Sequence, residues 1–295
     1  MTAETRFRPR RSCLYVPGDN ARALEKAASL PADVLILDLE DAVAPGGKAE
    51  ARQAIRNAAR DRAYGAREVL IRANGLETEW GQDDLEMAAS AGVDGVLVPK
   101  ITSGDDISFA DQSLNDAGAV PDLGLWAMIE TPLAILNIGE IAAASSNTRL
   151  TGFVIGTNDL AKEYNALATP DRQAFLFSLS AAVVAARAYG LAAIDGVYND
   201  IGNEAGLAAE CEQGRVLGFD GKTLIHPSQI ETANRVFAPS EAELSHAKDV
   251  VAAFASAENQ GKGVISLNGQ MVELLHLAQA ERLLAMHDAI RRMAS

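Results

Sequence analysis

Eight short apolar segments recur along the chain, and a stretch with helical spacing follows each of them. They span residues 12–16, 33–39, 68–73, 95–100, 124–130, 152–156, 191–196 and 219–225. Apolar strands that alternate with helices indicate a parallel sheet covered by those helices. Eight such units predict an α/β chain folded as a (β/α)₈ TIM barrel. A doubly wound open sheet is the alternative, but no G-x-G-x-x-G motif follows any of the segments.

The barrel accounts for most but not all of the chain. A length of 295 residues with 48% hydrophobic residues suits one barrel domain with a large core. We assign residues 1–238 to the barrel, since no linker rich in Pro, Gly or Ser divides the chain. Residues 239–295 are predicted to form a C-terminal helical extension, with a helix, the short apolar piece GVISLNG and a last helix.

Composition limits the partners of this protein. The formal net charge is −14 and the sequence pI is about 4.7, so we expect neither a nucleic-acid partner nor a membrane partner. The sequence shows no apolar run of membrane-span length and no secretory signal. Cys13 and Cys211 lie in unrelated contexts, which favours reduced thiols in a cytoplasmic protein. The basic residues near the start are expected to form a solvated arm: Arg6, Arg8, Arg10 and Arg11.

Charged and amide side chains follow five of the eight predicted strands. The carboxyl ends of barrel strands converge on one mouth, and charged residues are rare at the ends of buried strands unless they are paired or used. The residues are Asp38, Glu40 and Asp41 after the second strand, Arg72 and Asn74 after the third, Lys100 after the fourth, Glu130 after the fifth, and Asn158 and Asp159 after the sixth. We therefore expect the functional site at this mouth.

Glu130 and Asp159 are the candidate metal ligands. They lie on neighbouring strands, and two carboxylates suit a hard cation such as Mg²⁺ or Mn²⁺. The alternative is that both acids only cap the helices that follow them. Arg72 suits a clamp for a carboxylate or an oxyanion, or an ion pair within the mouth. Lys100 is either a Schiff-base lysine, as in a class I aldolase, or a lysine neutralised by the carboxylates around it.

Eight motifs in order give a resemblance to a known family. They are RSCLYVPG, DLEDAVAPGGKAEAR, IRANG, VLVPK, MIETP, GTNDLA, GFDGKTLIHPSQI and LNGQMVE. The chain resembles the citrate lyase beta-subunit-like proteins, acyl-CoA ester lyases within the HpcH/HpaI aldolase group, from about residue 11 to residue 292. The resemblance implies a barrel with a C-terminal extension, assembled as a homotrimer or hexamer. It also implies that the extension covers the site of a neighbouring subunit.

The resemblance also implies a set of site residues. Glu130 and Asp159 would hold Mg²⁺ and Arg72 would lie at the reacting carbonyl, while coenzyme A would meet the first loop after a strand through Tyr15 and Lys26. The expected substrate contacts are thus Arg72, Glu130, Tyr15 and Lys26. Two positions depart from the family pattern. Asn20 stands where some relatives carry an arginine, and Glu273 stands where the family usually has an aspartate with a proline two residues after it.

These residues lead to a hypothesis of Mg²⁺-dependent C–C cleavage. A short 3-hydroxyacyl-CoA such as malyl-CoA, β-methylmalyl-CoA or citramalyl-CoA would yield a 2-oxo acid and an acyl-CoA. Arg72 would stabilise the enolate, Glu273 would protonate it, and Asp41 is the second candidate for that proton transfer. The last helix would bury Leu274, Leu277 and Leu284 against a neighbouring barrel. The alternatives are a malyl-CoA thioesterase or malate-synthase-like activity, a metal-dependent aldolase for free hydroxy-keto acids, and a non-autonomous citrate lyase beta subunit.

Overall fold

The computed structural model describes residues 7–60 and 64–294 of the chain. They divide into two compact units. One unit is Arg10–Phe237, and the other contains the residues before Arg10 together with those from Ala238 onward. No helix in the described ranges has the length and apolar character needed to span a membrane.

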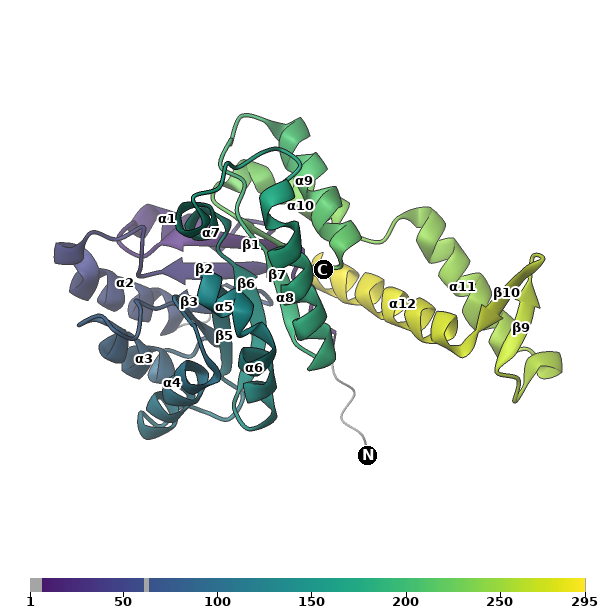
Figure 1. Cartoon of the computed structure of the whole chain (residues 1–295), viewed down its shortest axis with the longest axis horizontal. Coiled ribbons are helices and arrows are strands. Elements are labelled where there is room, and N and C mark those ends of the chain that lie inside the picture. The colour runs from purple at the N-terminus through teal and green to yellow at the C-terminus, as the bar shows by residue number, and fades with distance from the viewer. Residues whose placement is uncertain (1–6, 61–63, 295) are drawn as a thin grey trace. The chain divides into compact units, whose positions relative to one another are not determined.

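The larger unit is a closed barrel of eight parallel strands, each paired with the next and the eighth paired with the first (Figure 1). The strands are β1 (Ser12–Pro17), β2 (Val34–Asp38), β3 (Glu68–Arg72), β4 (Gly95–Val98), β5 (Gly124–Ile129), β6 (Leu150–Ile155), β7 (Ala192–Asp195) and β8 (Gly221–Leu224). Each of the eight predicted strands is present, so the prediction of a (β/α)₈ barrel is confirmed. The open-sheet alternative is wrong.

Helices connect the strands on the outside of the barrel. They are α1 (Ala21–Ala27), α2 (Lys48–Arg60), α3 (Gly81–Ser90), α4 (Gly104–Asp116), α5 (Pro132–Leu136), α6 (Ile138–Ala143), α7 (Thr157–Tyr164), α8 (Leu176–Ala188), α9 (Glu204–Leu217) and α10 (Ile230–Val236). Short 3₁₀ helices lie at Pro45–Gly47, Ala144–Ser146, Gln173–Phe175 and Pro227–Gln229.

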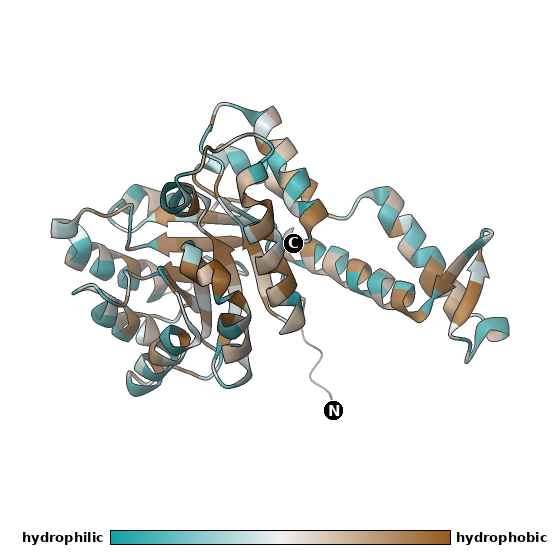
Figure 2. Cartoon of the chain, in the orientation of Figure 1, coloured by the Kyte–Doolittle hydropathy of each residue, from teal (hydrophilic) through white to brown (hydrophobic). Residues whose placement is uncertain are grey.

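Strand residues alternate between two apolar layers, as the pleat of a strand requires. On β2, Ile36 faces the interior of the barrel, whereas Leu35 and Leu37 pack in the layer under the helices. The strands are accordingly among the most hydrophobic parts of the chain (Figure 2). Trp126 on β5 fills the interior, and a Cβ added at Gly152 on β6 would collide with its ring. The interior is therefore a packed core that holds the strand ends rigidly.

The expected solvated arm is wrong for Arg10 and Arg11. Arg10 forms an ion pair with Glu68 (2.5 Å), and its guanidinium lies 4.9 Å from the centre of the Trp126 ring. Arg11 donates from Nε and Nη2 to the two oxygens of Asp33 at 2.8 Å each. These residues tie the segment before β1 to β2 and β3. Arg6 lies outside the described residues.

The smaller unit contains α11 (Glu241–Ala255), a short 3₁₀ helix (Ala257–Asn259), the antiparallel strands β9 (Val264–Leu267) and β10 (Gln270–Glu273), and α12 (Leu274–Ala294). The sequence analysis predicted only a short apolar piece, GVISLNG, where this hairpin lies. Asn268 and Gly269 both have positive φ, 50° and 80°, and Asn-Gly with this geometry is a strong hairpin signal.

The small core of this unit explains part of the pattern on its last helix. Leu277 and Leu284 pack on a cluster that includes Val250, Ile265 and Val272. They therefore contribute to the core of their own unit and are only partly buried there, and packing on the barrel of a neighbouring subunit stays a prediction. Leu274, in contrast, is 54% exposed.

Candidate active site

The turn after β5 fixes Glu130 at the mouth of the barrel. Thr131 is the N-cap of α5, where its side chain accepts from the backbone N–H of Ala134 at 3.0 Å, and Pro132 is the first helical residue. Proline is pre-organised for that position. Thr131, not Glu130, therefore caps the helix. Glu130 is 1% exposed and is delivered by a rigid strand.

Asp159 does not cap its helix either. It is the third residue of α7, whose N-cap position is Gly156, without a capping side chain. The interpretation of the two acids as helix caps is thus wrong for both, and their carboxylates are available for other contacts.

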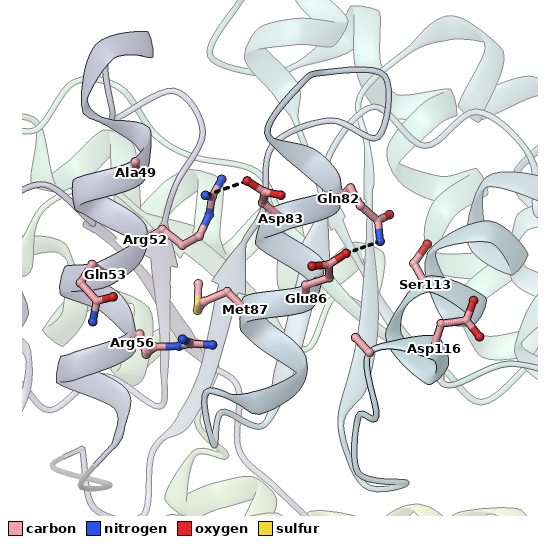
Figure 3. A pocket seen from close by; sticks show the side chains of 11 residues that line it. Ala49, Arg52, Gln53, Arg56, Gln82, Asp83, Glu86, Met87, Ser113 and Asp116 are labelled. Carbon is pink, nitrogen blue, oxygen red and sulfur yellow. Dashed lines mark hydrogen bonds and ion pairs between the residues drawn. The ribbon is translucent and has the colours of Figure 1, made fainter.

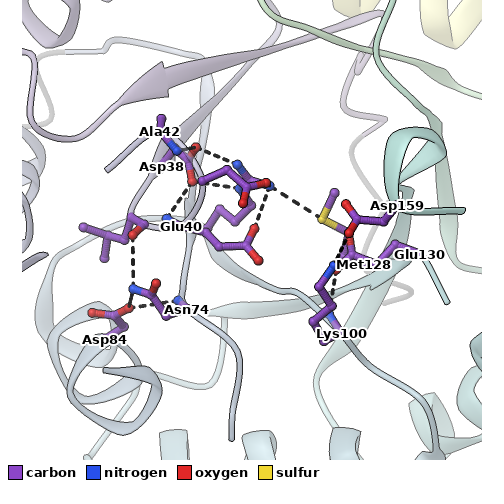
Figure 4. Close-up of polar contacts among 12 residues, drawn as sticks. Asp38, Glu40, Ala42, Asn74, Asp84, Lys100, Met128, Glu130 and Asp159 are labelled. Atoms are coloured by element: carbon purple, nitrogen blue, oxygen red, sulfur yellow. Dashed lines mark hydrogen bonds and ion pairs between the residues drawn. The ribbon is translucent and has the colours of Figure 1, made fainter. Parts of the chain in front are cut away.

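Glu130 and Asp159 converge on the ammonium of Lys100 (Figure 4). Lys100 Nζ lies 2.5 Å from Asp159 Oδ1 and 3.3 Å from Glu130 Oε1, and the Lys100 backbone N–H donates to Glu130 Oε1 at 2.8 Å. Burial raises the pKa of Glu130, against the lowering effect of Lys100. Burial lowers the pKa of Lys100, but the hydrogen bond to Asp159 and the charge of Glu130 outweigh it, so the net shift is upward. A Schiff base requires a neutral amine. This environment instead keeps Lys100 protonated, with its positive charge balanced by the two carboxylates, so it disfavours the Schiff-base role.

Arg72 is the centre of a second cluster. Its Nε and Nη2 donate to the two oxygens of Asp38 at 2.7 and 2.6 Å. Its Nη1 lies 2.7 Å from Glu40 Oε2 and 3.4 Å from Asp41 Oδ2, and it approaches the sulfur of Met128 at 4.0 Å. Asp38 thus fixes the plane of the guanidinium, and Nη1 is the part that faces the mouth.

Glu40 and Asp41 differ sharply in environment. The side chain of Asp41 is 74% exposed, whereas that of Glu40 is 15% exposed. Glu40 Oε2 is buried, and although Arg72 is near, no donor among the described residues is aligned to hydrogen-bond to it. Burial raises the pKa of Glu40 to about 8, against the lowering effect of Arg72. Glu40, which the sequence analysis did not choose, is therefore better suited than Asp41 to hold and release a proton near pH 7.

Tyr15 lies in β1 and not in the loop after it, where the resemblance located it. Arg72 Cζ is 4.6 Å from the centre of the Tyr15 ring. The hydroxyl is buried and has no hydrogen-bond partner among the described residues, and burial raises its pKa. Lys26 is exposed on α1, and Asn20 is the N-cap of that helix, accepting from Ala23 N. Tyr15 thus belongs to the Arg72 cluster, while Lys26 lies outside it.

Glu273 belongs to the smaller unit. It is the last residue of β10 and is partly buried, and its backbone N–H donates to His276 Nδ1 at 2.9 Å.

The residues present fit a magnesium ion. Within 7–60 and 64–294, no three or more His, Cys, Asp or Glu side chains gather as a metal site. Mg²⁺, however, is commonly bound through one or two carboxylates with water and substrate oxygens as the other ligands. Glu130 and Asp159 already direct oxygens at one cation, the Lys100 ammonium.

A hollow on the outside of the barrel, between α2, α3 and α4, is separate from these clusters (Figure 3). Its lining mixes charges of both signs, with Arg52 paired to Asp83 and Arg56 bonded to Ser90. This mixture does not favour an anionic ligand such as an acyl-CoA.

Comparison with known proteins identifies the family. The family model described as HpcH/HpaI aldolase/citrate lyase matches residues 11–227. The chain belongs to this family.

Relatives within the HpcH/HpaI family carry more than one activity in their names. The chain is 50% identical over 282 residues to a (3S)-malyl-CoA thioesterase of Cereibacter sphaeroides, with 96% of each chain covered. It is 39% identical over 275 residues to the citrate lyase subunit beta of Escherichia coli, covering 92% of this chain and 90% of the relative. The resemblance inferred from the motifs is confirmed, and the chain is an enzyme of the HpcH/HpaI aldolase/citrate lyase family.

A solved structure of the same family agrees with the fold. The protein CitE from Mycobacterium tuberculosis, in complex with magnesium, acetoacetate and coenzyme A, matches with a TM-score of 0.76 and 31% identity. The match covers 95% of this chain and 98% of that one.

Proposed function

We propose that this protein hydrolyses the thioester of a short hydroxyacyl-CoA, with (3S)-malyl-CoA as the first substrate to test. The observation that carries the proposal is the 50% identity to a (3S)-malyl-CoA thioesterase over 96% of both chains. C–C cleavage, the main expectation from the sequence, becomes the second candidate.

Hydrolysis of a thioester needs a group that stabilises negative charge on the carbonyl oxygen. Arg72 suits this role because Asp38 fixes its guanidinium through two hydrogen bonds. The remaining nitrogen, Nη1, faces the mouth beside Glu40 and Met128. A preorganised donor of this kind contributes roughly 3–4 kcal/mol to lowering the barrier.

Hydrolysis also needs a proton acceptor for water, and we assign this role to Glu40. The carboxylate takes a proton from water as the oxygen of that water bonds to the thioester carbon, and Arg72 holds the oxygen that becomes negative. The carbon–sulfur bond then breaks, and the sulfur of coenzyme A receives the proton from Glu40. The products are the free acid and the coenzyme A thiol, and Glu40 returns to its starting form.

We further infer that Glu130 and Asp159 hold Mg²⁺, or Mn²⁺, in the working enzyme. Bound there, the ion would supply positive charge to the carboxylate and hydroxyl end of a malyl group. Lys100 would balance the two acids when the ion is absent. For Tyr15 we propose a substrate contact through its buried hydroxyl, and for Lys26 a contact with coenzyme A at the exposed end of α1.

C–C lyase activity is the second candidate, and the 39% identity to citrate lyase subunit beta favours it. In that reaction Arg72 would stabilise an enolate, and a separate acid would protonate the enolate carbon. We propose Glu273 for this step, acting from the extension of a neighbouring subunit in a homotrimer or hexamer. Its position at the end of β10 fixes its main chain.

The two reactions differ in whether they release a thiol. Hydrolysis of malyl-CoA yields free coenzyme A, whereas cleavage leaves the thioester intact in the acyl-CoA product. Purified protein with Mg²⁺ should release thiol from (3S)-malyl-CoA, and Glu40→Gln should lower that rate by roughly 10²- to 10⁴-fold. Malyl-CoA that is consumed without release of thiol would favour the lyase.

A further inference from the structure

Lys48 occupies a place where a lysine is costly. It is the first residue of α2, and it is only 5% exposed. The positive end of the helix dipole disfavours a cation there, and burial of an ammonium costs free energy unless its donors are satisfied. A lysine that is retained against both effects needs strong local partners.

The Lys48 ammonium contacts the loop after β2 and the ring of Trp80. Nζ donates to the backbone oxygens of Leu39 at 2.8 Å and Glu40 at 2.7 Å. It also lies 5.3 Å from the centre of the Trp80 ring, where a cation is attracted to the face of an aromatic ring. The ammonium thus holds the carbonyl oxygens of two successive peptide groups, one on each side of the Glu40 α-carbon.

Asp38 also holds this loop. Its two oxygens accept from Glu40 N at 2.9 Å and from Ala42 N at 3.2 Å, and those oxygens also receive Arg72. Asn74 Nδ2 donates to the oxygen of Leu39 at 3.1 Å. With its main chain held in this way, Glu40 is directed at Arg72 Nη1.

We propose that Lys48 is a positioning residue that holds the loop after β2 so that the carboxyl of Glu40 stays buried beside Arg72. The catalytic part of this inference rests on the proposed role of Glu40. The structural part, that Lys48 fixes the environment of Glu40, does not.

The test is a double-mutant cycle of Lys48→Met with Glu40→Gln. Lys48→Met nearly keeps the length of the side chain and removes its donors, and it should lower kcat/KM on the order of 10²-fold, as a small misplacement of a catalytic group does. In the Glu40→Gln background the same change should cost less than about threefold, because the group that it positions is already inactive. Arg56→Met, which removes an exposed cation from the same helix, is the matched control and should leave kcat/KM unchanged.

Equal losses from Lys48→Met in both backgrounds would overturn the inference, since Lys48 would then act on the fold alone. Should Lys48→Met fail to fold, Lys48→Gln, which keeps one donor, enters the same cycle with the same expectation.

A second measurement does not depend on activity. The effect of Glu40→Gln on the free energy of unfolding should depend on pH, and that dependence should shrink when Lys48 is also replaced, because a released loop exposes the carboxyl to water. If the dependence is unchanged, Lys48 does not position Glu40. If it shrinks but malyl-CoA is not hydrolysed, only the proposed function fails.

Discussion

Glu40→Gln removes the charge of a buried carboxyl while nearly keeping its shape. Burial raises the pKa of that carboxyl from 4.5 to about 8, and Arg72 opposes the rise. The acids that face it are Asp38, Asp41 and Glu130, and each raises the pKa further. Glutamine resembles the protonated form, so the variant should behave like a wild-type protein that cannot ionise at this position.

The magnitude follows from the shift in pKa. Between about pH 4.5 and pH 8, folded Glu40 retains a proton that the unfolded chain has released. The free energy of unfolding of the wild type should therefore fall, relative to Glu40→Gln, by about 1.4 kcal/mol per pH unit in this window. Over the whole window the free energy of unfolding should fall by roughly 3–5 kcal/mol. The lower end of this range allows for water at the side chain, which is 15% exposed. The two proteins should differ little in this term below pH 4.5.

The assay is urea unfolding followed by tryptophan fluorescence from pH 4 to pH 9 in the presence of EDTA. Both tryptophans of the chain, Trp80 and Trp126, lie in Arg10–Phe237, so the signal reports on the barrel. Other titrating groups are common to both proteins and cancel in the difference. Glu50→Gln, at an exposed carboxylate on α2, controls for the substitution itself.

A difference that stays flat within about 0.5 kcal/mol from pH 5 to pH 9 would refute this reasoning. Glu40 would then be ionised in the folded protein at neutral pH. A role as a buried proton carrier would have no support.

Three further predictions concern the rest of the site. Glu130→Gln and Asp159→Asn should each abolish turnover and weaken Mn²⁺ binding, measured by electron paramagnetic resonance, by at least about tenfold (1.4 kcal/mol); unchanged binding would exclude them as ligands. Arg72→Lys should lower kcat roughly 10²- to 10³-fold, because lysine lacks the planar fork; a near-normal rate would leave Arg72 a structural ion-pair partner of Asp38. For the lyase candidate, inactive Arg72→Ala and Glu273→Ala proteins should regain part of their C–C cleavage when unfolded and refolded together. Mixed oligomers that remain inactive would contradict a site shared between subunits.

The sequence was sufficient for the barrel because its strands are buried on both faces. An uninterrupted apolar run such as VLIL in β2 marks a strand whose side chains enter two apolar layers. Acids and bases that interrupt such runs at their ends therefore mark the mouth. Glu130 and Asp159 were found in this way, and they converge on Lys100.

The choice between Glu40 and Asp41 could not be made from the sequence. The two acids are adjacent, and the turn of the main chain after β2 decides which of them is buried beside Arg72. Lys48 was missed for a related reason. It reads as an ordinary polar residue at the start of an amphipathic helix, and only the path of the loop after β2 brings it to Leu39 and Glu40. The hairpin turn Asn268-Gly269 was recognisable as a turn, but the four-residue strands on either side are too short for a clear alternating pattern.

Hydrolysis of (3S)-malyl-CoA in ¹⁸O-labelled water tests the central proposal most directly. The purified protein and Mg²⁺ are incubated with the thioester, and the products are analysed by mass spectrometry. We expect free coenzyme A and malate with one ¹⁸O in the carboxylate that was the thioester, because the oxygen of water bonds to that carbon. Glyoxylate and acetyl-CoA, with neither free coenzyme A nor labelled malate, would contradict thioester hydrolysis and assign the chain to C–C cleavage.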